Sequence, residues 1–234
     1  KRTYEHYRSL GKPVLVIDAG ALEREVTWKI AVNNITSEGY YGHTENLDLD
    51  RPAKLGVTLQ NNKLNDKILI AAQHNKSLQW EGMPGLEDWT VDLIHKIRQY
   101  SERHIVVRYH PRCPFFIPTQ RFKMLLMNKV IENCTLETPM QIESTYDAFN
   151  IDYNYHCVIN HSSGPGINAV IAGSNVIVDT KSLAYPMSIA LEEIENPPKK
   201  KNKEKWLVEI SHTEYTVDEI AEGLWLKRLK DSLV

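Results

Sequence analysis

The sequence predicts an α/β protein in which helices flank a parallel sheet. Short apolar runs of strand length alternate along the chain with stretches of helical pattern. Alternating strands and helices build parallel sheets, because each helix returns the chain across the sheet in a right-handed crossover. The 234 residues suffice for one large α/β domain or for one and a half smaller ones. The apolar runs assigned to the sheet are Lys67–Ala72, His104–Arg108, Cys157–Ile159 and Val176–Val178.

The remaining elements of the first half are predicted from turn residues and apolar spacing. Val14–Ile17 is predicted to be a strand because it follows the turn-forming sequence Gly-Lys-Pro. Residues 33–66 are polar and rich in Asn, Gly and Asp, so irregular structure is expected there. Trp89–Glu102 has apolar residues at helical spacing with charges between them, which indicates an amphipathic helix.

The second half predicts shorter helices. Residues 136–158 are expected to hold another short strand and a helix. Gly166–Ala172 is a run of small and apolar residues, predicted to be a helix closed by Gly173. Thr216–Leu229 is predicted to form a final helix, and its first residues have the Thr-x-x-Glu spacing of a capping box.

Composition argues against several classes of protein. The net charge of −2 is nearly balanced, so the chain is no global polycation of the kind that binds nucleic acid or membranes. Cys113, Cys134 and Cys157 lack metal-like spacing, and their odd number argues against a disulfide framework. A reducing cytoplasm is therefore expected. No apolar run reaches the roughly 20 residues of a membrane span, and the first residues lack the apolar region of a signal peptide.

Cationic and polar residues follow each of four predicted strands. The carboxyl ends of parallel strands lie at one edge of a sheet, where ligands of α/β proteins bind. Cations at four successive strand ends favour an anionic ligand such as a diphosphate. The residues concerned are Gln73, Lys76, Arg108, His110, Arg112, His161 and Lys181.

The loop after Cys157–Ile159 is rich in hydroxyls and glycine. Ser162, Ser163 and Gly164 come directly before a predicted helix, whose N-terminal N–H groups stabilise an anion. An ordinary strand-to-helix turn, with serines as helix caps, is the alternative interpretation. The loop matches neither the dinucleotide-binding fingerprint nor the P-loop.

Two of these segments together resemble a known enzyme class. "IVVRYHP", followed by "HSSGPGINAVIAGSNVIV", resembles the C-terminal half of GT-B glycosyltransferases over roughly residues 67–190. The likeness is greatest to capsule-type enzymes with a His-Pro and a later Ser-Ser motif, namely sialyl-, Kdo- and polyglycerophosphate transferases. The tail "WLVEISHTEYTVDEIAEGLWLKRL" and the early "VLVIDAGALEREVTWKIAVNNI" look like uncharacterised, often phage-encoded, glycosyltransferase-like proteins.

The resemblance implies a GT-B-like, Rossmann-like fold and roles for individual residues. Residues 1–60 would be a remnant or a part of the N-terminal acceptor-side domain, and residues 61–234 a Rossmann-like donor-binding domain with a C-terminal helix. The family's His-Pro motif contacts the donor nucleotide, and its Ser-Ser motif holds the donor phosphates. The sequence departs from the family at Asn168, where a carboxylate usually grips a ribose or sugar hydroxyl. The positions that match are His110 and Pro111, then Ser162, Ser163 and Gly164.

The reaction expected is metal-independent transfer from a UDP- or CMP-linked sugar, with no cofactor. A base deprotonates the acceptor hydroxyl while cations stabilise the departing phosphate. Lys76, Arg112 and Lys181 are the expected cations, and the sequence has no Asp-x-Asp motif for a metal. Asp18 is the candidate base, unless it is only a turn former, with Glu23 and Glu25 as substitutes. His161 is expected to act as an acid or phosphate donor, unless it is a buried structural histidine.

The sequence does not decide between two acceptors, and it allows two alternatives to the transferase function. A hydroxymethylated base in phage DNA, within the host cytoplasm, and a surface glycan are the two acceptors considered. The lysine run at residues 199–205 favours double-stranded DNA, unless it is a solvated linker, whereas the balanced charge disfavours DNA. The alternatives to transfer are a nucleotide-sugar epimerase and a non-catalytic nucleotide or nucleic-acid binding module on the same fold.

Overall fold

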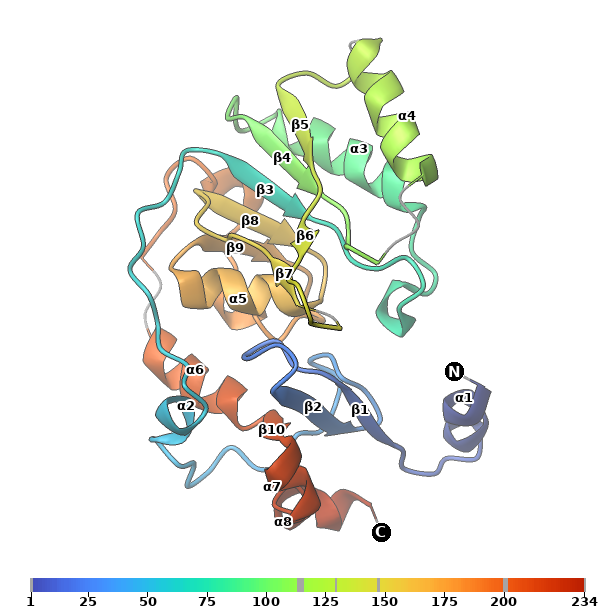
Figure 1. The fold of residues 1–234 in the computed structure, drawn as a ribbon, viewed down its shortest axis with the longest axis vertical. Helices are drawn as coiled ribbons and strands as arrows, with labels where there is room; N and C mark the ends of the chain where they lie inside the picture. Colours follow the sequence, from blue (N-terminus) through green and yellow to red (C-terminus); the bar gives the residue numbers. More distant parts are fainter. Residues whose placement is uncertain (1, 113–115, 129, 147, 200–201, 234) are drawn as a thin grey trace.

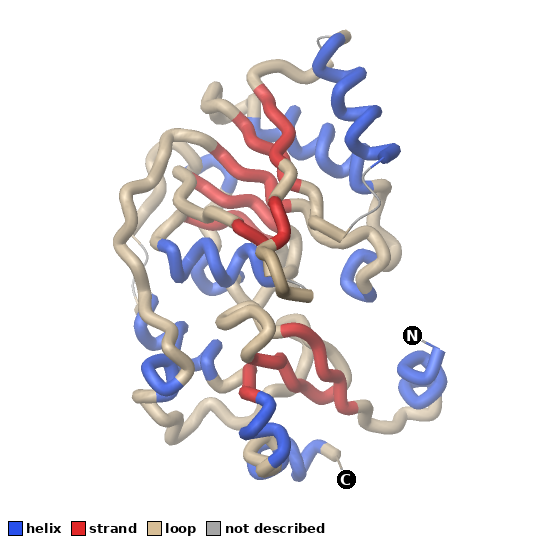
Figure 2. Tube along the Cα trace, in the orientation of Figure 1, coloured by secondary structure: helices blue, strands red, loops and turns tan. Residues whose placement is uncertain are grey.

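The described chain forms a five-stranded parallel sheet, a three-stranded antiparallel sheet and a two-stranded hairpin. The computed structural model describes residues 2–112, 116–128, 130–146, 148–199 and 202–233. A parallel sheet with its helices forms the upper part of Figure 1, and a smaller antiparallel sheet lies below it. Figure 2 shows the strands of the two sheets as separate groups. The predicted α/β class, with a parallel sheet flanked by helices, is confirmed.

The larger sheet has five parallel strands in the order β5-β4-β3-β8-β9. Every residue of β3, β4 and β8 is buried, as expected for central strands covered on both faces. Four of the five strands are the apolar runs that the sequence predicted, to within one residue at each end, namely β3 (Ile68–Ala71), β4 (Ile105–Arg108), β8 (Cys157–Asn160) and β9 (Asn175–Val178). The fifth, β5 (Cys134–Glu137), was not among the predicted runs.

Helices cover both faces of this sheet because successive strand residues point to opposite sides. Ile68 and Ile70 of β3 pack in one apolar cluster with α3 (Leu86–Ile97) and α4 (Phe116–Met127). Leu69 and Ala71 pack in a second cluster with α5 (Gly164–Ala172) and α6 (Lys203–Ser211). The sheet is therefore the centre of a three-layer arrangement (Figure 1).

The strand order creates a crevice at one position. From β3 the chain proceeds through β4 to β5 on one side, then returns to β8 and β9 on the other. β3 and β8 are thus neighbours from which the chain departs in opposite directions. In sheets of this type the space outside the carboxyl ends of such a pair is left uncovered and holds the ligand. The loops after Ala71 and Asn160 border that space.

The smaller sheet joins the two ends of the chain. Its antiparallel order is β1-β2-β10, where β1 is Leu15–Ala19, β2 is Thr27–Val32 and β10 is Glu214–Thr216. Ile30 and Val32 pack with Tyr215 and Leu229 in a separate small core. The division of the chain at residue 60 stays a prediction, but the segment from β10 onward lies with the N-terminal strands. Sequence periodicity did not indicate this pairing.

Three sequence predictions about helix ends can be compared with the structure. The final helix is split into α7 (Val217–Ala221) and α8 (Leu226–Leu229), because Gly223 between them adopts a positive φ of 72°. The capping box at the start of α7 is confirmed, with the Glu219 N–H donating to the Thr216 hydroxyl at 3.2 Å. Gly173 closes α5 in the left-handed conformation as predicted, with φ 96°.

The helix expected within residues 136–158 is wrong for the described part of that range. A short hairpin stands there instead, formed by β6 (Met140–Gln141) and β7 (Phe149–Asn150). The Ile142 N–H donates to the Ala148 carbonyl at 3.0 Å and continues the pairing toward the hairpin tip. α4 was not predicted at all. The remaining short elements are α1 (Arg2–Ser9), α2 (Arg51–Lys54), η1 (Leu78–Trp80), η2 (Tyr185–Met187), η3 (Leu191–Glu193) and η4 (Lys230–Ser232).

Two further expectations concern cysteines and membranes. Cys134 and Cys157 are buried free thiols, and burial raises the pKa of both. Cys113 lies outside the described residues. Among the helices that the structure describes, none combines the length and the apolar character needed to cross a bilayer.

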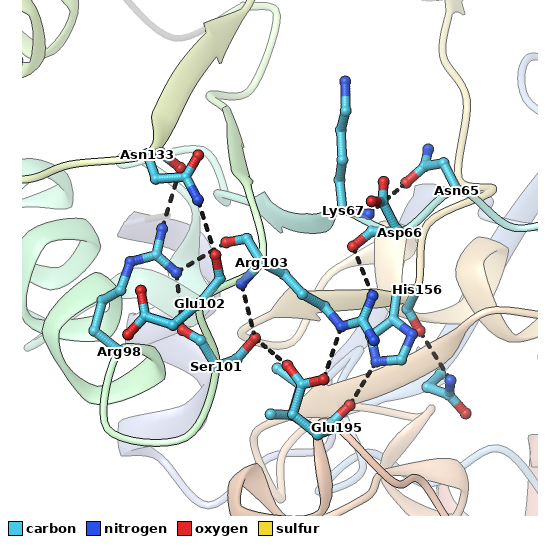
Figure 3. Close-up of polar contacts among 12 residues, drawn as sticks. Asn65, Asp66, Lys67, Arg98, Ser101, Glu102, Arg103, Asn133, His156 and Glu195 are labelled. Carbon is cyan, nitrogen blue, oxygen red and sulfur yellow. Dashed lines mark hydrogen bonds and ion pairs between the residues drawn. The ribbon is translucent and has the colours of Figure 1, made fainter.

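A polar network closes the amino edge of the parallel sheet, at the opposite end from the crevice (Figure 3). Arg103 donates from Nε to the Glu195 carboxylate at 3.1 Å and from Nη1 to the Asp66 carbonyl at 3.0 Å. Ser101 donates its hydroxyl to the same carboxylate. These contacts tie the loop before β4 to the segment after η3, and they lower the pKa of Glu195, the Ser101 hydrogen bond most and Arg103 next.

We expect Glu195→Gln to destabilise the protein slightly at neutral pH, and we expect the difference to fade in acid. A carboxylate whose pKa is lowered by folding contributes stability above its unfolded pKa of about 4.3, and loses it as the pH falls through the lower folded pKa. The side chain is 37% exposed, so water screens the pair and the effect should be below about 1 kcal/mol. Thermal unfolding at pH 7 and pH 3 measures it. The neighbouring exposed Glu102→Gln is the control, and an equal loss in both variants would contradict the assignment.

Candidate functional site

A cavity of about 590 Å³ lies between the two sheets. One wall is the carboxyl edge of the parallel sheet, namely the ends of β3, β4 and β8 and the start of α5. The other wall is β1 with the turn that leads into β2, and the hairpin β6–β7 closes one side. The cavity therefore occupies the crevice that the strand order creates.

Most of the residues singled out in the sequence line this cavity. They come from segments up to 150 positions apart, and the parallel register brings the strand ends to one edge. Asp18, the candidate base, lies on the wall opposite the Ser-Ser loop. Those that line the cavity are Asp18, Gln73, Arg108, His110, Pro111, Ser162, Ser163, Gly164 and Asn168, together with the substitute Glu23.

Three expected cations lie outside the cavity lining. Lys76 is exposed, and Lys181 lies 3.7 Å from Glu38 beside a separate, smaller pocket of about 180 Å³. Arg112 donates to the Tyr146 carbonyl at 2.7 Å and lies over the Tyr146 ring. The structure thus does not bring these three side chains to the ligand position that the sequence analysis assumed.

His161 also lies outside the lining, in an environment that suits a structural histidine. Its ring packs edge-to-face on Trp80 with 5.5 Å between ring centroids, and it is 7% exposed. Nδ1 is 4.0 Å from a carboxylate oxygen of Asp179. Burial lowers the pKa of His161 more than Asp179 raises it, so the neutral ring is favoured near pH 7.

Two buried amides hold the Ser-Ser loop in place. Gln73, which follows β3, accepts from the Ser162 N–H at 3.1 Å and from its hydroxyl at 3.2 Å. Asn160 at the end of β8 accepts from the Ser163 N–H at 2.9 Å and donates to the Ala71 carbonyl at 2.7 Å. The loop is therefore anchored to both strands of the crevice.

The start of α5 is left without a side-chain cap. Ser163 is the N-cap residue, but its hydroxyl contacts the Asn160 side chain and makes no capping bond to the helix. The described residues provide no acceptor for the Gly164 N–H either. An ordinary capped turn does not account for this arrangement. The unpartnered Gly164 N–H and the helix dipole instead favour a negative charge in the adjoining cavity.

Arg108 places one buried positive charge in the cavity wall. It is 3% exposed, donates from Nε to Glu137 at 3.0 Å and from Nη2 to the Asp152 carbonyl at 2.9 Å. Its guanidinium also lies over the Tyr153 ring, 5.4 Å from the centroid. Nη1 is buried and has no hydrogen-bond partner. A buried donor without a partner is costly, so Nη1 favours an anion in the adjoining cavity even though Glu137 pairs with the same guanidinium.

The smaller sheet contributes a charged face that the sequence analysis missed. Lys29 of β2 stands opposite Asp18 of β1 and opposite Glu214 of β10, so the three side chains share one face of the sheet. Lys29 lines the cavity although it is only 7% exposed. The signal was present as alternation in "TWKIAV", where Thr27, Lys29 and Ala31 fall on one side.

Glu214 fixes the turn that follows Asp18. Its fully buried carboxylate accepts from the Ala21 N–H at 2.7 Å, the Leu22 N–H at 3.0 Å and the Thr27 hydroxyl at 2.7 Å. Ala21 in turn meets the start of α5, since a Cβ placed on Gly164 would lie 3.2 Å from the Ala21 Cβ. This buried carboxylate therefore links the smaller sheet to the Ser-Ser loop.

Comparison with known proteins gives structural likenesses but no match to a family or to a curated sequence. The solved structure of KpsC, a β-Kdo 2,7 transferase from Thermosulfurimonas dismutans, is similar over 94% of this chain and 78% of that chain. The TM-score is 0.46 and the sequence identity is 13%.

We expect Gly20→Ala to destabilise the protein and to disturb the cavity wall. An added Cβ would lie 2.3 Å from the Thr27 hydroxyl and 2.4 Å from both Glu214 Oε2 and the Thr27 carbonyl. Overpacking of this kind costs about 1–3 kcal/mol or more. Gly85→Ala is the control, because its Cβ would meet only ordinary contacts at 3.5 Å and beyond. Chemical denaturation measures both variants, and an unchanged midpoint for Gly20→Ala would show that the turn is loosely held.

Proposed function

We propose that this protein is a glycosyltransferase that moves a sugar from a nucleotide-sugar donor to a hydroxyl acceptor. The observation that supports it most is the uncapped start of α5, with Ser162, Ser163 and Gly164, opening on a cavity at the crevice between β3 and β8. A diphosphate is the anion that such a position suits. The resemblance of the His-Pro and Ser-Ser motifs to GT-B enzymes points to the same donor class.

The donor would lie along the carboxyl edge of the parallel sheet. Its phosphates would contact the Ser-Ser loop, and its nucleoside would extend toward His110 and Pro111, which line the same cavity. Asn168, one turn into α5, would bond a ribose or sugar hydroxyl through its amide. Arg108 is positioned to compensate the charge that develops on the departing phosphate. We include metal-independence in the proposal because Arg108 and helix N–H groups can supply that compensation.

The acceptor would enter from the side of the smaller sheet. The Asp18 carboxylate would take the proton of the acceptor hydroxyl while its oxygen bonds to the anomeric carbon. The bond from that carbon to the phosphate oxygen breaks at the same centre, and the nucleotide leaves with the electron pair. Lys29 is the cross-strand neighbour of Asp18 and lies on the same face of the sheet.

Nothing in the cavity singles out DNA as the acceptor. The described residues of the lysine run at 199–205 do not line it, and the side chain of Lys205 is 3.8 Å from Glu209 within α6. We therefore propose a hydroxyl acceptor without assigning it to DNA or to a glycan. An epimerase is less well supported, because the carboxylates among the described lining residues are limited to Asp18 and Glu23.

Donor binding is the first test of the proposal. His110→Ala and Ser162→Ala should each weaken the binding of UDP or CMP by about 1–3 kcal/mol, the cost of a hydrogen bond to a charged group. Lys76→Ala and Lys181→Ala are matched controls, since both cations lie outside the cavity and should leave the affinity within a factor of about two. Calorimetric titration measures all four. Full affinity in both cavity variants would remove the phosphate site from the proposal.

The role of Asp18 is tested by Asp18→Asn. The side chain accepts from the Ala19 N–H at 2.9 Å, a contact that a turn former would also make. Asparagine keeps that contact through Oδ1 and removes the proton acceptor. Turnover should fall by about 10²–10⁴, the contribution of a positioned base, with nucleotide affinity nearly unchanged. Steady-state kinetics measures the turnover, and calorimetric titration measures the nucleotide affinity. Undiminished turnover would return Asp18 to a structural role, and nucleotide binding without turnover in the wild type would favour a binding module.

A further inference from the structure

Two adjacent strands of the parallel sheet end in the same kind of turn. After β3, His74 accepts at Nδ1 from the Lys76 N–H at 2.9 Å. After β4, His110 accepts at Nδ1 from the Arg112 N–H at 3.1 Å. The two imidazoles meet edge-to-face, with 5.0 Å between ring centroids and 70° between planes. Both histidines line the cavity, whereas Lys76 and Arg112 do not.

These backbone contacts determine where the neutral rings hold their protons. A ring nitrogen that accepts an N–H cannot also hold a proton, so the proton of the neutral His74 ring is on Nε2. Nε2–H is then a hydrogen-bond donor, and no described residue accepts from it. The turn after β3 thus supplies a hydrogen-bond donor in a fixed position at the cavity edge.

His74 lies between the two donor-binding segments. Its neighbour Gln73 bonds to Ser162 on the β8 side, whereas the His74 ring contacts His110 on the β4 side. In the loop after β3, these two adjacent side chains therefore reach both neighbouring loops. The loop after β3 therefore crosses the crevice at the position where a ligand on α5 would extend toward the His-Pro motif.

We propose that His74 is a donor-binding residue that gives its Nε2–H to a phosphate oxygen of the nucleotide. This rests on the proposed function, because the anion is the phosphate group of a nucleotide-sugar donor. It places a hydrogen-bond donor from the loop after β3 in the cavity, where the sequence had suggested the cation Lys76. The alternative is that His74 only closes the strand end through its Nδ1 contact.

Two substitutions separate these roles. His74→Asn keeps an oxygen close to the position of Nδ1, so the turn can persist, but it removes the distal donor. His74→Gln places an amide N–H near the position of Nε2 and loses the proximal acceptor. We expect His74→Asn to weaken UDP and inorganic pyrophosphate binding about tenfold or more with little change in Tm. His74→Gln should retain affinity within about threefold of the wild type and lower Tm. Asn75→Ala, at an exposed neighbour, is the control and should change neither.

The outcomes distinguish this inference from the function on which it rests. Wild-type affinity in His74→Asn, while Ser162→Ala binds weakly, would overturn the role of His74 and leave the phosphate site standing. Failure of the wild type to bind UDP, CMP or pyrophosphate would overturn both. The tautomer gives a readout that needs no ligand. Nitrogen chemical shifts of the His74 ring at pH 7.5 should show the proton on Nε2, and a proton on Nδ1 would overturn the inference.

Discussion

The Glu214 carboxylate is the contact on which the cavity depends. Glu214 belongs to the last strand of the chain, yet it accepts hydrogen bonds from the N–H groups of Ala21 and Leu22 in the turn after β1, and Ala21 lies 193 positions earlier in the sequence. It also accepts from the Thr27 hydroxyl at the start of β2. A buried carboxylate is tolerated only when hydrogen bonds compensate its charge, so the turn and the carboxylate stabilise each other. Gly20 leaves room for this contact, and Gly164 lets α5 approach the turn.

The two walls of the cavity have different electrostatic character. The wall from the parallel sheet offers N–H groups, the buried Arg108 and two imidazoles, which together attract an anion. The wall from the smaller sheet offers Asp18 and Lys29 as cross-strand neighbours. The proposed transfer needs positive potential at one side of the anomeric carbon and a base at the other, and it assigns these roles to the two walls.

The two turns at residues 74–76 and 110–112, each a histidine followed two residues later by a cation, explain why two predicted cations, Lys76 and Arg112, lie outside the cavity. In each turn the main-chain N–H of the cationic residue points back to the histidine Nδ1. The imidazole faces the cavity, while Lys76 is left exposed and Arg112 contacts Tyr146. The positive character of this edge therefore comes from N–H donors and from Arg108, which remains at the end of β4 itself.

The sequence alone determined the parallel sheet, its strand ends and the Ser-Ser loop, because buried strands and glycine-rich turns are local signals. Nine of its predicted site residues, from Asp18 to Asn168, and the substitute Glu23 line the cavity. Tertiary structure alone decided the pairing of β10 with β2, since a three-residue strand has no usable periodicity. It also decided that His74 rather than Lys76 lines the cavity, and that Lys29 joins Asp18. Those outcomes depend on one hydrogen bond in a turn and on cross-strand register, and neither is visible in a linear pattern.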